Sequence, residues 1–134
     1  MSEYISNQPI LNAVAATGVG AAMNVKDKRH VIIELSTAAV GSGDSVTVKF
    51  AASNSEACPN FAASQSSSNI WDYIQVIDLE DGSPIDGDTG ITIADANDVR
   101  RVEIQSNGAN WINVEVVSVT GTLTVSASGS AYLD

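Results

Sequence analysis

Polar and apolar residues alternate without a break in the stretch Ser45-Val46-Thr47-Val48-Lys49-Phe50. Successive side chains of a β-strand point to opposite faces of its sheet, so Val46, Val48 and Phe50 share one face. A strand with one apolar and one polar face is typical of an antiparallel sheet that covers a core on one side. The stretch therefore predicts a half-buried antiparallel strand.

The same two-residue period recurs on both sides of this stretch, and a weaker strand is predicted near residues 10–16. The other residues expected to face the core are Val31, Ile33, Leu35, Val102, Ile104, Leu123, Val125 and Ala127. Turn-forming residues separate these stretches, and Asn107-Gly108 predicts a tight hairpin between its flanking strands. About eight strands and no helix are expected, which favours one antiparallel β-sandwich or jelly-roll-like domain over residues 1–134.

Two stretches depart from simple alternation. Residues 73–77 are apolar on both faces, which indicates a central strand or a strand covered by another subunit. In residues 111–119 the apolar positions change parity after Val116, so a β-bulge is predicted there. The small residues at 18–22 indicate a loop or a strand edge approached closely by another backbone.

The charge balance excludes some partners. The chain has 134 residues, with 16 Asp and Glu against 6 Lys and Arg, for a formal net charge of −10. Such a surface repels phosphate backbones and anionic lipids, so neither nucleic acid nor a membrane is an expected partner. Residues 1–9 contain no secretory signal, so the protein is expected to be made in a cytoplasm.

The inventory of reactive side chains argues against an enzyme. His30 is the only histidine and Cys58 the only cysteine, so neither a disulfide nor a Cys/His metal site can form within the chain. No nucleophile elbow is present, and a serine hydrolase would depend on His30 as its base. Cys58 is interpreted as a small residue packed beside Pro59, with a reactive thiol as the alternative.

Acidic residues gather between positions 78 and 90. Asp78, Asp81, Asp86 and Asp88 could converge on calcium, which binds about six to eight oxygen ligands. The EF-hand pattern is not met, because Gly90 and Ile91 follow where Asp or Asn and then Gly are needed. Two acidic turns are the alternative, and no other cofactor is predicted.

Aromatic residues leave another alternative open. Trp71, Tyr73 and Trp111 could form a platform that stacks on sugars, as in carbohydrate-binding modules. Anchoring in the core or at an interface is the competing interpretation.

The sequence between Trp71 and Ile91 resembles a segment of small all-β structural proteins of tailed bacteriophages and prophages. The similarity continues through Asp98–Glu103, Asn107-Gly108 and Trp111-Ile112, and covers roughly residues 30–127. The resemblance implies a virion protein of the head-decoration, neck, tail or fibre type, and it transfers no catalytic residues.

Together these observations predict a non-enzymatic capsid decoration protein that forms a trimer and binds the major capsid protein or another virion protein. The alternatives are a neck, tail or fibre component, or a carbohydrate- or receptor-binding module. Residues 1–14 are expected to act as an assembly arm and residues 51–69 as a long functional or docked loop. The predicted interface residues are Ile10, Leu11, Val14, Lys26, Lys28, Arg29, Phe61, Trp71 and Tyr73.

Overall fold

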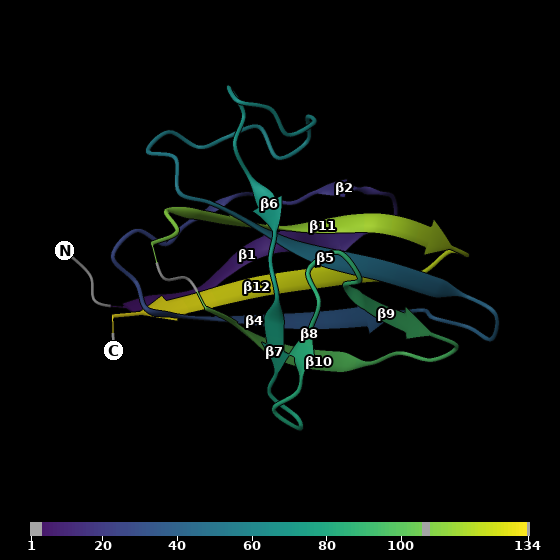
Figure 1. Ribbon diagram of the computed structural model, residues 1–134. Helices are drawn as coiled ribbons and strands as arrows, with labels where there is room; N and C mark the ends of the chain where they lie inside the picture. Colours follow the sequence, from purple (N-terminus) through teal and green to yellow (C-terminus); the bar gives the residue numbers. More distant parts are fainter. Residues whose placement is uncertain (1–3, 106–107, 134) are drawn as a thin grey trace.

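The computed structural model describes residues 4–105 and 108–133, and these residues form β-strands, turns and loops with no helix. There is accordingly no helix in this part of the chain that could span a membrane. Two sheets pack face to face as a β-sandwich (Figure 1). The strands are β1 Tyr4–Val14, β2 Gly18–Val19, β3 Met23–Asn24, β4 His30–Ala38, β5 Ser45–Ser53, β6 Asp72–Tyr73, β7 Val76–Asp78, β8 Pro84–Ile85, β9 Ile91–Ala94, β10 Val99–Gln105, β11 Trp111–Thr120 and β12 Thr124–Tyr132.

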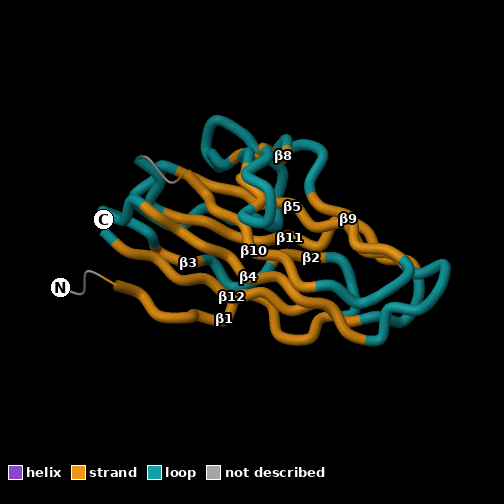
Figure 2. The backbone as a smooth tube through the Cα atoms, turned by 90° about the horizontal axis from the view of Figure 1, so that it is seen from below, coloured by secondary structure: helices purple, strands orange, loops and turns teal. Residues whose placement is uncertain are grey.

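All strand pairs are antiparallel, as the alternating sequence predicts. Sheet A has the order β1-β12-β4-β10-β7-β8, and Figure 2 shows its four long strands side by side. Sheet B has the order β2-β11-β5-β6, with β3 also paired to β11 and β9 to β5. The predicted sandwich is therefore confirmed.

The core lies between the sheets and is built from the alternating residues. Val46, Val48 and Phe50 of β5 are fully or almost fully buried, and they share the core with residues of β4, β10 and β12 and with Leu123 just before β12. Those residues are Val31, Ile33, Leu35, Val102, Ile104, Leu123, Val125 and Ala127, all of them buried as predicted. The predicted β-bulge is also confirmed, because the register of β11 against β5 shifts between Val116 and Ser118.

Two local predictions are wrong. Residues 73–77 do not form a central strand, because the chain leaves sheet B after β6 and enters sheet A at β7, as the vertical run in Figure 1 shows. This crossing explains why side chains on both sides of the stretch are apolar. The hairpin at Asn107-Gly108 is also wrong, since β10 pairs with β4 and β7 while β11 pairs in the other sheet. Asn107 itself lies outside the described residues.

Strand β1 is an integral edge strand of sheet A. It pairs with β12 from Tyr4↔Tyr132 to Val14↔Val125, and its Ile10 and Leu11 are buried in the core. Gly20 packs against it closely, because an added Cβ would lie 2.4 Å from the carbonyl oxygen of Ile10. The close backbone approach predicted for residues 18–22 is therefore confirmed, and only glycine fits at that point.

Candidate binding surface

The outer face of sheet B is covered by the chain's own long loop, which runs from the end of β5 to β6 and projects at the top of Figure 1. Phe61 of this loop and Trp71 at its end are buried with Ala51 of β5. The ring centroids of Phe61 and Trp71 are 5.9 Å apart, and those of Trp71 and Tyr73 are 5.1 Å apart in an edge-to-face arrangement. The loop is therefore docked on its own domain by a small aromatic core.

Hydrogen bonds hold this loop in place. The indole N–H of Trp71 donates to the carbonyl of Ala63 at 3.1 Å, and that of Trp111 donates to the carbonyl of Glu56 at 3.1 Å. The side-chain amide of Asn69 donates to the carbonyl of Asn60 at 2.9 Å and accepts from the Asn60 backbone N–H at 2.9 Å. The indoles are thus used inside the domain, which does not support a sugar-stacking platform.

Tyr73 closes the cluster on the side of β6. Its hydroxyl donates to Glu115 Oε1 at 2.7 Å, and the Nζ of Lys49 lies 4.8 Å from the centroid of its ring. Loss of hydration, together with the hydrogen bond to Glu115, raises the pKa of Tyr73 to about 12. The tyrosine therefore stays neutral, and it links β6, β5 and β11 on the covered face.

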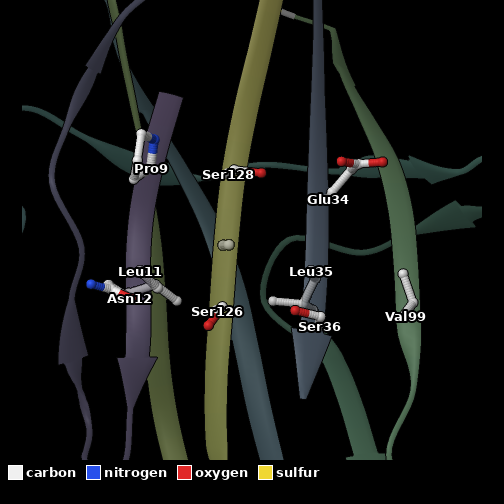
Figure 3. A pocket seen from close by; sticks show the side chains of 10 residues that line it. Pro9, Leu11, Asn12, Glu34, Leu35, Ser36, Val99, Ser126 and Ser128 are labelled. Carbon is white, nitrogen blue, oxygen red and sulfur yellow. The ribbon is translucent and has the colours of Figure 1, made fainter. Parts of the chain in front are cut away.

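The outer face of sheet A, in contrast, is open. In the middle of β12 the outward side chains are small, with Ser126, Ser128 and Ser130 between the larger side chains of β1 and β4. An open depression of about 390 Å³ lies here, with Pro9 on one side, Val99 on the other and the serines between them (Figure 3). A neighbouring depression of about 490 Å³ is lined by Tyr4, Ile32, Leu79 and Arg101 among others.

The hydroxyl groups of β12 are used by two irregularities of β1. Asn7 and Ala13 have positive φ angles of 38° and 48°, where β1 departs from regular pairing. Their backbone N–H groups donate to Ser130 Oγ and Ser126 Oγ, each at 2.9 Å, instead of to the ladder. The serines therefore satisfy donors that the bulges would otherwise leave to water.

The charged groups of this face are paired as well. Arg101 Nε lies 3.3 Å from Glu34 Oε2 across β10 and β4, and both side chains are more than half exposed. His30 Nδ1 lies 2.9 Å from Glu103 Oε2, and the His30 ring stacks on Tyr132 with centroids 5.1 Å apart. Apolar side chains stand beside these pairs, with Val99 66% and Leu79 38% exposed.

The interface residues predicted from the sequence lie in different parts of the structure. Ile10 and Leu11 are almost fully buried, and Leu11 also lines the depression on the outer face of sheet A, so their assignment to an interface stays a prediction. Val14 is half-buried against the core. Phe61, Trp71 and Tyr73 meet one another on the outer face of sheet B and are used by the loop. An arm role for residues 1–14 stays a prediction, now limited by the pairing of β1 with β12.

The basic residues Lys26, Lys28 and Arg29 lie in the turn before β4. Asp27 takes a positive φ of 64° there, and the backbone N–H of Arg29 donates to the carbonyl of Tyr132 at 3.1 Å. The turn lines an open depression with Gly108, Asn110 and Leu133 at the end of the sandwich where β1 begins and β12 ends. It is thus separate from the serine-lined face.

The predicted calcium ligands do not converge. Asp78 is buried, and its Oδ2 lies 3.2 Å from Arg100 Nη1. Asp81 Oδ1 accepts from the hydroxyl and the backbone N–H of Ser83, which lowers the pKa of that carboxyl, and Asp86 Oδ1 accepts from the N–H of Asp88. In the described ranges, no group of three or more His, Cys, Asp or Glu is placed to hold a metal, so geometry favours the acidic turns.

Sequence reasoning missed the residues that line the open face, above all Ser126, Ser128, Val99, Glu34 and Arg101. Their signal was present, because each stands at a position of the outward parity in its strand. Which outward face the chain would cover with its own loop was not readable from that parity.

The fold is shared with two solved structures of prophage proteins. The SPBc2 prophage-derived protein YomS matches with a TM-score of 0.63 and 17% identity, over 98% of this chain and 96% of YomS. The PBSX exported protein XepA matches with a TM-score of 0.65 and 19% identity, over 98% of this chain and 39% of XepA. This chain therefore spans well under half the length of XepA.

No protein-family model and no curated protein sequence matches the chain. At identities below one fifth, the two structural matches establish a common fold. Their prophage origin agrees with the phage resemblance drawn from the sequence. The head-decoration part of that resemblance stays a prediction.

Proposed function

We propose that the chain is a non-enzymatic structural protein of a bacteriophage particle that acts by binding other protein subunits. The observation that carries the proposal is the match of 98% of the chain to prophage proteins. A sandwich of this kind offers its sheet faces, edges and loops to partners.

Capsid decoration is the specific role that we propose, with the protein located in the virion and bound to the major capsid protein or another virion protein. The open face of sheet A supports binding, because its serines, the Arg101–Glu34 ion pair and the His30–Glu103 contact have partners within the chain. Polar groups that already have partners can be buried by another subunit without leaving unpaired donors or acceptors.

The two most reactive side chains favour a non-enzymatic role. His30 is engaged by Glu103 and stacked on Tyr132. Cys58 is exposed rather than packed into the domain, although its Sγ lies 3.4 Å from the carbonyl of Pro59, and loss of part of its hydration raises the pKa of the thiol. A raised pKa leaves less of the nucleophilic thiolate at neutral pH, which argues against a catalytic cysteine.

Particle analysis tests the proposal. Phage particles released by cells that encode the chain are purified on a density gradient, and the chain is quantified beside the major capsid protein. We expect it to sediment with intact particles in a fixed ratio to the capsid protein, and purified protein to bind saturably to particles that lack it. Absence from particles would overturn the virion role, while a few copies per particle would place it at the neck, tail or fibre.

A further inference from the structure

The open face of sheet A carries side chains of both signs of charge. The chain carries a formal net charge of −10, yet Glu34 and Glu103 on this face each have a cationic or protonatable partner, Arg101 and His30. Two copies of so acidic a protein repel one another over most orientations. Repulsion is reduced where a negative charge of each copy has a positive charge beside it, as Glu34 has in Arg101.

We propose that this face is the contact surface for a second copy of the same chain, with the two copies related by a two-fold axis. Glu34 and Arg101 are direct neighbours across β4 and β10. A two-fold axis that lies in the interface, parallel to these strands and midway between them, places Glu34 of each copy opposite Arg101 of the other. The face is therefore complementary in charge to itself, which is what a two-fold contact requires.

Shape supports the same arrangement. Val99 of β10 is 66% exposed and stands directly opposite Ser36 of β4 in the ladder. Under the same axis, Val99 of one copy lies over Ser36 of the other, at the depression that Ser36 lines together with Ser126 and Ser128. An exposed apolar side chain thus meets a hollow with small side chains, and its burial favours association.

The face is large enough for a specific contact. At about 4.8 Å between strands and about 3.4 Å per residue, the four long strands and their short neighbours present about 500–700 Å² per copy. Two copies together would bury about 1,000–1,400 Å², which reaches the range of specific protein interfaces. A two-fold contact gives an even number of copies, so it competes with the trimer expected from the sequence.

A second copy of the chain as partner of the open face deepens the proposed function. The contact can be tested on the purified protein alone, by exchanging the charges at positions 34 and 101. The variants are Glu34→Arg and Arg101→Glu, alone, mixed and combined in one chain, studied by sedimentation over a concentration series. Each single variant should raise the dimer dissociation constant at least about tenfold, because like charges then face each other. An equimolar mixture of the two single variants and the doubly exchanged chain should both recover the dimer.

Control variants separate this effect from folding and from total charge. Glu56→Arg makes the same charge change in the loop over sheet B, and the dimer should be unaffected. Val99→Arg inserts a charge into the open face without touching the ion pair, and it should abolish the dimer even if one exchange variant fails to fold.

The proposal is overturned if the wild-type protein stays monomeric at every concentration, if it forms a trimer, or if the mixture of single variants does not associate. A monomer found in virions would overturn this inference alone. A dimer that never enters particles would overturn only the virion role.

Discussion

The outer faces of the two sheets differ in what covers them. Of the chain's two Trp, three Tyr and two Phe residues, four lie over sheet B, where Phe61, Trp71, Tyr73 and Trp111 hold the long loop. The outer face of sheet A instead carries serines, the Arg101–Glu34 ion pair, the His30–Glu103 contact and isolated apolar side chains. The outer face of sheet B is covered by a loop of the same chain. The outer face of sheet A is exposed, and its polar side chains pair with neighbouring strands.

The comparison teaches that aromatic residues in the sequence are a poor guide to which face of this molecule is left open. Trp71, Tyr73 and Phe61, the aromatic residues predicted as interface anchors, pack against one another within the domain. The open face is mainly polar, but its hydroxyl and charged groups are satisfied by neighbouring strands. Such a face needs no cover from its own chain, because its polar groups have partners when it is exposed.

Removing a buried aromatic side chain from the covered face of sheet B should lower the free energy of unfolding more than any other change proposed below. Trp71→Ala removes a buried ring that packs on Phe61 and Tyr73, and it also removes the hydrogen bond to Ala63. We expect the free energy of unfolding to fall by about 3–5 kcal/mol, measured by chemical denaturation. Ile70→Ala is the matched control, since the neighbouring Ile70 is 60% exposed and should change stability by less than about 0.5 kcal/mol. Equal small losses would show that the loop is not anchored.

High pH should reduce the stability that Tyr73 contributes on the same face. The pKa of Tyr73 is raised to about 12 in the folded protein, so the folded state favours the neutral phenol. This stabilisation is complete below the ordinary pKa of tyrosine, about 10, and is lost as pH rises toward 12. Partial solvation limits its size to about 1 kcal/mol. The stability difference between wild type and Tyr73→Phe should therefore shrink between these pH values, and a constant difference would contradict the role of Glu115.

The serine hydrogen bonds of the open face should contribute less to the free energy of unfolding than the aromatic cluster does. Ser126→Ala removes the acceptor of the Ala13 backbone N–H at a bulge of β1. We expect a loss of about 0.5–1 kcal/mol, because water can replace part of this exposed hydrogen bond. Ser128→Ala is the control, as the Ser128 hydroxyl donates to the side chain of Asn7 and no backbone donor loses its partner. Hydrogen exchange at Ala13 should rise only in the first variant.

The sequence predicted the sandwich because its evidence is local. Period-two alternation fixes which residues of a strand face the core, and Val46, Val102 and Leu123 are buried as expected. The bulge after Val116 was readable for the same reason, since a change of parity is a property of one strand. These predictions need no knowledge of which strand lies beside which.

Predictions that depended on strand neighbours fared less well. Asn107-Gly108 has the composition of a hairpin turn, but β10 and β11 belong to different sheets. The sequence predicts Trp71 and Tyr73 as interface residues, and it does not show that residues 54–70 pack over them. Glu34 and Arg101 are 67 positions apart, and only the pairing of β4 with β10 makes them one ion pair. Long-range pairing, rather than residue type, separates what was found from what was missed.

The smallest effect is expected for Val99→Thr, and it bears directly on whether the face of sheet A is open. Threonine keeps the β-branched shape of valine, so strand propensity and local packing are preserved. Val99 is 66% exposed, and in dilute protein the substitution should change the free energy of unfolding by less than about 0.5 kcal/mol. At concentrations where two copies associate, binding stabilises the folded state, and the variant should lose more of that added stability than it loses when dilute. The measurement is thermal unfolding at two protein concentrations, with Ile70→Ala as an equally exposed control outside the face. A loss above about 1 kcal/mol in dilute protein would mean that Val99 is already covered within its own chain, and the contrast between the two faces would disappear.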